Sequence, residues 1–336
     1  MLKNRFIDCI YTHTEGEPTC IVHHGIPYPA GLDILGKRAF LEKNYDWLRQ
    51  SLMREPRGHQ DMFGVFVTPP SSSDYDAGMI WMDGTHFHDM CGHGTIALSM
   101  ALVSHNLVPV TGNRTTIRYE TTAGDVTAEV ASNDQAAEWT RFENVPAYVA
   151  ERDIPLDVPE VGRVNVDLSF GGNYFIQLDW GNRQPRIAPE NASYFSRLGL
   201  LVKKLFNEKV KVVHPTKPNI KHVDFVTIYH DGTLPGAFYR NVHVFSDGKM
   251  DRSPGGTGTS AMLAMLESRG RIKVGQTIQS EGLLGSGTFE GCIIRETKLG
   301  NHRALVPTVK GTANVIGYAK WLMSPDDPVS KGFVIS

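Results

Sequence analysis

The sequence predicts an α+β fold made of two similar halves. Many short strand-like segments are separated by Gly, Asn and Pro, whereas only a few segments have helical spacing. This mixture favours α+β over a doubly wound parallel sheet. A glycine-rich turn that opens a helix also occurs twice, and 336 residues are enough for two domains of ordinary size.

The first copy of this turn, residues 90–95, reads Met-Cys-Gly-His-Gly-Thr, and an apolar helical run follows it to about Asn106. Glycines at the start of a helix let a ligand approach the backbone N–H groups closely. Cys91 lies at the positive end of the helix dipole, which favours a thiolate. The turn therefore predicts an anion-binding site with a reactive sulfur beside it.

The second copy, residues 255–259, reads Gly-Gly-Thr-Gly-Thr and repeats two glycines and a threonine of the first copy in register. Two related helix starts indicate two related halves, which we expect to face each other across a cleft. The copies differ at one important position, because the counterpart of Cys91 is Gly255. The predicted site therefore has one cysteine rather than two.

The remaining elements follow from local pattern. Helical spacing predicts helices over 33–53 and in a segment capped by Ser193, and Gly270 is expected to end the helix of the second turn. Residues 13–19 are expected to form a loop. Strands are predicted at residues 6–11, 62–68, 78–82, 116–120, 126–130, 138–143, 163–170, 174–179, 223–229, 236–245, 276–281, 287–296, 302–309 and 311–321.

Composition excludes several classes of function. The 41% apolar and 21% charged fractions are typical of a soluble globular protein, and a net charge of −2 gives no basis for binding nucleic acid or an anionic membrane. The first residues do not resemble a signal peptide, and no run is long enough to span a bilayer. Four cysteines in a chain of this length do not make a disulfide framework. We therefore expect a cytoplasmic enzyme.

Other residues that suggest chemistry have simpler explanations. His86 and His88 have a spacing that places two imidazoles on one side of a strand, but no third ligand is evident, so no metal site is predicted. Neither glycine-rich turn has the Gly-Lys-Ser/Thr ending of a phosphate-binding loop. The other cysteines are expected to be buried apolar residues, namely Cys9, Cys20 and Cys292.

The chain resembles the proline racemase family, which includes proline racemase, 4-hydroxyproline epimerase and trans-3-hydroxy-L-proline dehydratase. The resemblance runs nearly end to end. It rests on ordered blocks that include His-Thr-Glu-Gly-Glu-Pro-Thr at 13–19, Glu-Pro-Arg-Gly-His at 55–59, the turn at 90–95, Asp-Arg-Ser-Pro at 251–254 and the turn at 256–259.

This resemblance implies two α/β halves of the diaminopimelate-epimerase type, each a mixed sheet around a central helix, with the active site in the cleft between them. The halves would comprise residues 1–150, joined by a C-terminal return of 321–336, and residues 151–320. It also implies a proline-type substrate, no metal, PLP or nicotinamide cofactor, and a homodimer.

By matching position, the resemblance gives roles to individual residues. Cys91 would be the base that removes the α-proton. His93 and Asp251 would hold the ring nitrogen of the substrate, and Phe245 would line the ring pocket. The backbone N–H groups that would bind the substrate carboxylate belong to Gly92, His93, Gly256 and Thr257.

Gly255 departs from the family pattern, in which racemases and epimerases carry Cys and dehydratases typically carry Thr. Racemisation needs a second acid/base on the opposite face of the substrate, which glycine cannot supply, whereas elimination needs only one base. The sequence therefore predicts a hydro-lyase that converts trans-3-hydroxy-L-proline to Δ1-pyrroline-2-carboxylate. Two alternatives stay open. One is a 4-hydroxyproline 2-epimerase or proline racemase with another second base, and the other is a non-catalytic binder of proline-like ligands.

Overall fold

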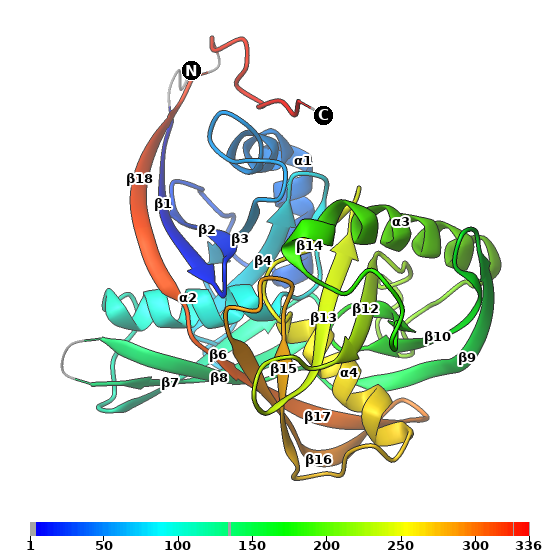
Figure 1. Cartoon of the computed structure of the whole chain (residues 1–336). Coiled ribbons are helices and arrows are strands. Elements are labelled where there is room, and N and C mark those ends of the chain that lie inside the picture. The colour runs from blue at the N-terminus through cyan, green and yellow to red at the C-terminus, as the bar shows by residue number, and fades with distance from the viewer. Residues whose placement is uncertain (1–4, 134–135, 325, 336) are drawn as a thin grey trace. The chain divides into compact units, whose positions relative to one another are not determined.

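The computed structural model describes residues 5–133, 136–324 and 326–335. The chain divides into two compact units, the first made of Met1–Thr140 with Thr312–Ser336 and the second of Arg141–Gly311 (Figure 1). The resemblance implies slightly different boundaries, with residues 1–150 and 321–336 in the first half and residues 151–320 in the second. In the part of the chain that is described, no helix combines the length and apolarity needed to span a bilayer.

The first unit contains a mixed sheet with the strand order β18-β1-β2-β3-β4-β6-β7. The β2/β3 and β4/β6 pairs are parallel and the others are antiparallel. Helix α1 follows β2, helix α2 follows the short strand β5, and β8 crosses the boundary between the units. The bounds are β1 Arg5–Thr14, β2 Glu17–His24, α1 Ile34–Met53, β3 Phe63–Thr68, β4 Ala77–Asp83, β5 Phe87–His88, α2 Gly92–Ser104, β6 Arg114–Thr121, β7 Gly124–Ser132, β8 Ala137–Glu143 and β18 Asn314–Met323.

The second unit repeats this order, with a sheet arranged as β9-β10-β11-β12-β13-β15-β16-β17. Here the β11/β12 and β13/β15 pairs are parallel, helix α3 follows β11, and helix α4 follows the short strand β14. The prediction of two similar halves is confirmed. The bounds are β9 Tyr148–Val158, β10 Gly162–Phe170, β11 Tyr174–Asp179, η1 Pro189–Asn191, α3 Ala192–Lys209, β12 Phe225–Asp231, β13 Ala237–Phe245, β14 Lys249–Asp251, α4 Gly256–Ser268, β15 Thr277–Glu281, β16 Thr288–Leu299 and β17 His302–Gly311.

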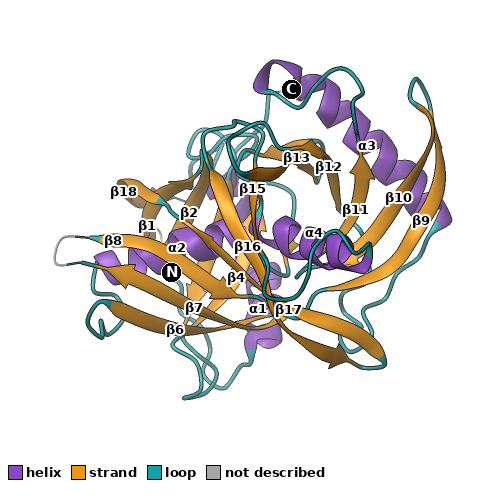
Figure 2. Ribbon diagram, turned by 60° about the horizontal axis from the view of Figure 1, so that its bottom comes forward, coloured by secondary structure: helices purple, strands orange, loops and turns teal. Residues whose placement is uncertain are grey.

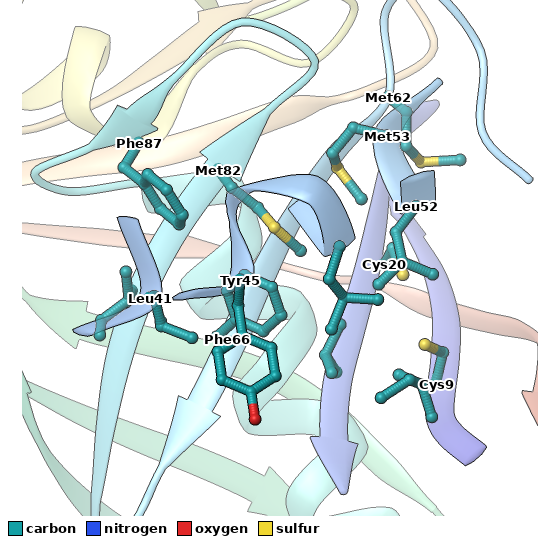
Figure 3. Close-up of a cluster of buried hydrophobic side chains, with 14 of the residues drawn as sticks. Cys9, Cys20, Leu41, Tyr45, Leu52, Met53, Met62, Phe66, Met82 and Phe87 are labelled. Atoms are coloured by element: carbon teal, nitrogen blue, oxygen red, sulfur yellow. The ribbon is translucent and has the colours of Figure 1, made fainter. Parts of the chain in front are cut away.

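Strand alternation places the sheet of the first unit between its two helices. In β4, Ile80 and Met82 pack into the core cluster that includes α1, whereas Trp81 points to Gly94 of α2. Because both faces are covered, every residue of β4 is buried. Figure 3 shows the side of this core that faces α1, where Leu41 and Tyr45 lie beside side chains from the sheet.

Two of the cysteines lie in this same cluster. Cys9 and Cys20 are free and buried among apolar side chains, as predicted (Figure 3). A hydrogen bond with Cys20, together with burial, raises the pKa of the Cys9 thiol. Such a thiol is not a nucleophile at neutral pH. Cys292 is also free but only half-buried, in β16 of the second unit.

The second unit has the same layered arrangement, and Figure 2 shows β11 and β12 between α3 and α4. Along β13, a Cβ added to Gly199 of α3 would lie 2.5 Å from Cβ of Val244, so this strand residue faces α3. The preceding residue, His243, faces the start of α4 instead, where it packs against Gly258. Alternation along one strand therefore supplies an imidazole to the start of the central helix.

The loop predicted at residues 13–19 is wrong. β1 continues to Thr14 and β2 begins at Glu17, so the turn consists of Glu15 and Gly16, with φ of 47° and 85°. Two residues with positive φ are typical of a tight β-hairpin turn. The flanking polar side chains suggested a loop, but Thr14, Glu17 and Thr19 are buried strand residues. The Thr14 hydroxyl donates to the carbonyl oxygen of His93 at 3.1 Å.

Two further predictions of local structure need correction. α3 begins after Asn191, which makes no capping hydrogen bond through its side chain, so Ser193 lies inside the helix. Strand β9 was missed because exposed charged residues and Pro155 interrupt its apolar pattern. It lies at the edge of the second unit's sheet, and its pairing with β10 is irregular near Asp153, which has a φ of 58°.

Candidate active site

Cys91 immediately precedes α2. Its backbone is extended, with φ −140° and ψ 123°, and its Sγ accepts a hydrogen bond from the N–H of Gly94 at 3.3 Å. The Thr95 hydroxyl donates to the Cys91 carbonyl oxygen at 2.6 Å, which fixes the backbone there. The sulfur therefore caps the helix at the end where the dipole stabilises negative charge. Gly92 is the first residue of the helix.

His93 lies beside this sulfur. Its Nδ1 and Nε2 atoms are 3.4 Å and 3.6 Å from Sγ of Cys91. The Phe63 ring meets the imidazole edge-on, with 5.1 Å between ring centroids. Cys91 and His93 are both almost fully buried. A thiol and an imidazole at this separation can share a proton, so His93 can exchange protons with Cys91 as well as contact a ligand.

Gly94 brings the start of α2 close to the sheet. A Cβ at this position would lie 2.3 Å from the Trp81 ring and 3.1 Å from Sγ of Cys91. No larger residue fits without moving the helix or the indole. The close contact between helix and sheet therefore fixes the position of the sulfur.

In the second unit, Asp251 ends β14 and is linked to the start of α4. Its Oδ1 accepts hydrogen bonds from the N–H and the hydroxyl of Ser253, at 2.8 Å and 2.7 Å. The Ser253 hydroxyl in turn accepts from the N–H of Gly255 at 3.1 Å. Oδ2 of Asp251 lies 3.4 Å from the position of a Cβ on Gly255. The carboxylate is therefore held next to the helix start, where a substrate amine can pair with it.

Gly255 precedes α4 as Cys91 precedes α2. Its φ of 74° and ψ of 110° form a conformation that favours glycine. Because Gly255 has no side chain, it makes no capping hydrogen bond of the kind that Cys91 makes at α2. The N–H groups of Gly256 and Thr257 belong to the first turn and have no partner within the helix. The start of α4 can therefore bind an anion.

The space beside Gly255 is filled by the imidazole of His243. A Cβ on Gly255 would lie 2.2 Å from both Cδ2 and Nε2 of this ring. Nδ1 is 2.8 Å from the hydroxyl oxygen of Thr227, and Nε2 is 3.0 Å from the carbonyl oxygen of Pro254. The residue is 2% exposed.

Sequence reasoning missed His243, although a signal was present. Asn241, His243 and Phe245 alternate along β13, and Phe245 was already assigned to the ring pocket. Phe245 is buried and stacks on Phe225, with ring centroids 5.4 Å apart. Residues two apart on a strand share a face, so the imidazole lies on the side of β13 that Phe245 occupies.

The predicted site residues thus fall into two groups. The first unit brings together Cys91, Gly92 and His93, and the second brings together Phe245, Asp251, Gly255, Gly256 and Thr257.

His86 and His88 do have a third potential ligand nearby, which the sequence did not reveal. One ligand atom from each histidine and one from Asp83 lie within 4.8 Å of one another. However, Oδ1 of Asp83 already accepts hydrogen bonds from the N–H groups of Thr85 and His86, at 2.6 Å and 2.9 Å. These bonds explain the carboxylate as the acceptor of a tight turn. The absence of a metal site stays a prediction.

Two helix starts, one with a thiol and an imidazole and one with a carboxylate and an imidazole, define a protein equipped to bind a small anion and move protons. The family model described as proline racemase matches residues 9–334, and the chain belongs to this family of enzymes.

Relatives in this family have different activities. The chain is 60% identical over 327 residues to a 4-hydroxyproline 2-epimerase of Cereibacter sphaeroides, covering 97% of both chains. It is 36% identical over 335 residues to a trans-3-hydroxy-L-proline dehydratase of Azospirillum brasilense, covering 100% of both. A solved structure of a hydroxyproline epimerase from Agrobacterium vitis, with bound trans-4-hydroxy-L-proline, matches with a TM-score of 0.92 at 29% identity. That match covers 100% of this chain and 96% of the other.

Proposed function

We propose that this chain is a 4-hydroxyproline 2-epimerase, which inverts C2 of trans-4-hydroxy-L-proline to give cis-4-hydroxy-D-proline. The observation that carries this proposal is the 60% identity to an epimerase of that name, against 36% to a dehydratase. The dehydratase prediction depended on the lack of an acid/base side chain at Gly255. The imidazole of His243 beside Gly255 removes that reason.

In the proposed reaction the two helix starts bind the substrate carboxylate together. Backbone N–H groups of Gly92, His93, Gly256 and Thr257 would surround its oxygens, where negative charge develops as the α-proton leaves. Asp251 would pair with the ring nitrogen, and Phe245 would line the pocket for the ring. This arrangement stabilises the carbanion through fixed dipoles, so the proposed reaction uses no metal or organic cofactor.

Cys91 is the proposed base on one face of the substrate. As a thiolate at the start of α2 it takes the α-proton, and the electron pair of the C–H bond stays on the substrate, delocalised into the carboxylate. A proton delivered to the opposite face completes the inversion. The hydro-lyase reaction is the second candidate, because the chain is also 36% identical to a trans-3-hydroxy-L-proline dehydratase and elimination needs only one base.

We also propose that the protein is a cytoplasmic homodimer. Four apolar side chains are exposed on the strand pair β1 and β18, where Phe6 and Leu322 are direct neighbours. An apolar patch of this kind favours an interface between subunits. Light scattering should give a mass near twice the 37.2 kDa of the chain, and Ile316→Lys should give a monomer. A monomeric wild-type protein would contradict this expectation.

The proposed function is tested by incubating the protein with trans-4-hydroxy-L-proline and with trans-3-hydroxy-L-proline, and following both by proton NMR. We expect the 4-hydroxy compound to epimerise and the 3-hydroxy compound to stay intact. Cys91→Ser should lower the rate of epimerisation by about 10²-fold or more, because it removes the thiolate. Pyrroline carboxylate from the 3-hydroxy compound alone would instead support the hydro-lyase. Binding without proton exchange would support a non-catalytic binder.

A further inference from the structure

We propose that His243 is the second acid/base of the epimerisation and acts in place of the side chain that Gly255 lacks. This inference rests on the proposed function, since inversion at C2 requires one group to remove a proton and another to deliver one from the opposite face. Imidazole changes its protonation near neutral pH more readily than any other side chain.

The position of the imidazole carries the argument. The residue before α2, Cys91, supplies a reacting atom, and the matching position before α4 has none. The side-chain atoms closest to a Cβ on Gly255 are Cδ2 and Nε2 of His243, both at 2.2 Å, followed by Oδ2 of Asp251 at 3.4 Å. The ring therefore occupies the volume into which a side chain of residue 255 would extend, next to the carboxylate proposed to bind the substrate amine.

Gly255 and His243 form one matched arrangement. The backbone at Gly255 has a φ of 74°, whereas Cys91 has a φ of −140°. Any side chain on Gly255 in this conformation would overlap the imidazole. A glycine at 255 is thus the condition under which an imidazole can approach this helix start. The pairing explains how an epimerase can lack the second cysteine.

The two hydrogen bonds of His243 fit an imidazolium, and the bond to Thr227 is kept when Nε2 has lost its proton. The carbonyl oxygen of Pro254 only accepts, so it bonds to Nε2, the nitrogen nearest Gly255, when that nitrogen carries a proton, as it does in the imidazolium. The Thr227 hydroxyl either donates to Nδ1 or accepts from it, so it bonds to a neutral ring and to an imidazolium alike. The Phe175 ring meets the imidazole of His243 edge-on, with 5.6 Å between the two ring centroids, and further fixes its position.

The proton balance closes in both directions. In one direction the Cys91 thiolate takes the α-proton from one face of the substrate. The His243 imidazolium gives its Nε2 proton to the substrate carbon from the opposite face, which breaks the hydrogen bond of that proton to the Pro254 carbonyl. A thiol and a neutral imidazole remain. In the other direction the neutral imidazole, whose remaining proton is on Nδ1 and bonded to Thr227, takes the α-proton on Nε2, and the thiol returns one. Exchange with water restores the starting form of the enzyme.

The test follows the α-proton of each 4-hydroxyproline epimer separately in D2O by proton NMR. In His243→Gln we expect epimerisation to fall by about 10²- to 10⁴-fold, the usual contribution of an acid/base group. One epimer should still exchange its α-proton for deuterium without inversion, because Cys91 still faces it. In Cys91→Ser the other epimer should be the one that exchanges. This complementary pattern requires an acid/base on each face.

A packing role alone is the competing explanation, since Trp81 packs against Gly94 much as His243 packs against Gly258. Epimerisation by His243→Gln within tenfold of wild type would overturn the proposal. So would loss of exchange from both epimers in a His243→Gln protein with an unchanged unfolding midpoint. If the glutamine variant does not fold, His243→Asn takes its place in the same assay.

His230→Gln is the matched control. This imidazole lies on the neighbouring strand β12, is 1% exposed, and is also bonded through both nitrogens, to the N–H of Ile187 at 3.2 Å and the carbonyl oxygen of Asp231 at 2.7 Å. We expect this variant to epimerise at the wild-type rate. A wild-type protein that epimerises neither trans-4-hydroxy-L-proline nor cis-4-hydroxy-D-proline would overturn the proposed function. Wild-type turnover with an equally active His243→Gln would overturn only the role of His243.

Discussion

The residues Gly255 and His243 share one volume at the start of α4. A side chain at 255 would meet the ring at 2.2 Å, and the backbone there has a φ of 74°. Both the overlap and the backbone strain oppose any other residue at this position while the histidine is present. The two residues are therefore coupled in stability as well as in chemistry.

This coupling predicts that Gly255→Cys will not improve the enzyme. The variant should lose at least about 2 kcal/mol of unfolding free energy, from strain plus overpacking, and its epimerisation should slow. In a His243→Ala background the overlap is gone, so Gly255→Cys should cost about 1–3 kcal/mol less unfolding free energy. This coupling is measured by urea denaturation of the wild type, the two single variants and the double variant. Additive losses of stability would show that the two residues do not share the space.

The place of Cys91 at a helix start was predicted from the sequence and is confirmed, whereas the sequence did not single out His243, for a physical reason. The signal at Cys91 is local, because the glycines and the helix that shape its surroundings are its neighbours in the chain. The imidazole reaches Gly255 only after β13 has paired with β14, where His243 lies opposite Asp251. Alternation shows which residues of a strand share a face, but not which helix start that face meets.

At the scale of the elements, glycines hold both central helices close to their neighbours. In the second unit, Gly171 lies after β10, and a Cβ on it would be 2.5 Å from the backbone N of Ala261 and the carbonyl oxygen of Thr257. The Asn144 amide donates to the carbonyl oxygen of Gly171 at 2.8 Å and to the hydroxyl of Ser260 at 2.9 Å. The first turns of α4 are thus fixed by contacts that leave no room for a methyl group.

Gly171→Ala should therefore move the start of α4. We expect a loss of about 1–3 kcal/mol in unfolding free energy from overpacking. We also expect kcat/KM to fall by about 10²-fold, because a displacement near 1 Å disturbs the proposed carboxylate site. Gly317→Ala is the control, since a Cβ there has no heavy atom within 4 Å. Equal kcat/KM values for the two variants would contradict a positioning role for Gly171.

Element prediction was reliable where a long periodic pattern was present, as in α1, and unreliable where burial overrides polarity. The polar run at 13–19 suggested a loop, yet Thr14, Glu17 and Thr19 are buried strand residues. The strand β9 was missed because an edge strand tolerates charges and a proline. Local propensity does not show which polar residues the tertiary structure buries.

At the scale of the whole molecule, two units of one topology each present a central helix with a different group at its start. A thiol and an imidazole lie at the start of α2, and a carboxylate and an imidazole lie at the start of α4. The proposed inversion needs two acid/base groups, one for each face of the substrate, and the proposal gives these roles to Cys91 and His243. The repeated fold was evident from the sequence, whereas the unequal chemistry of the two helix starts required the structure.

The most direct test of the epimerase proposal is to start the wild-type reaction from each epimer in turn. We expect the reactions from trans-4-hydroxy-L-proline and from cis-4-hydroxy-D-proline to reach the same equilibrium mixture. Chiral chromatography or polarimetry measures the composition of that mixture. Neither reaction should form pyrroline carboxylate. If neither epimer is converted, while trans-3-hydroxy-L-proline loses water, the chain is a dehydratase and the central claim is wrong.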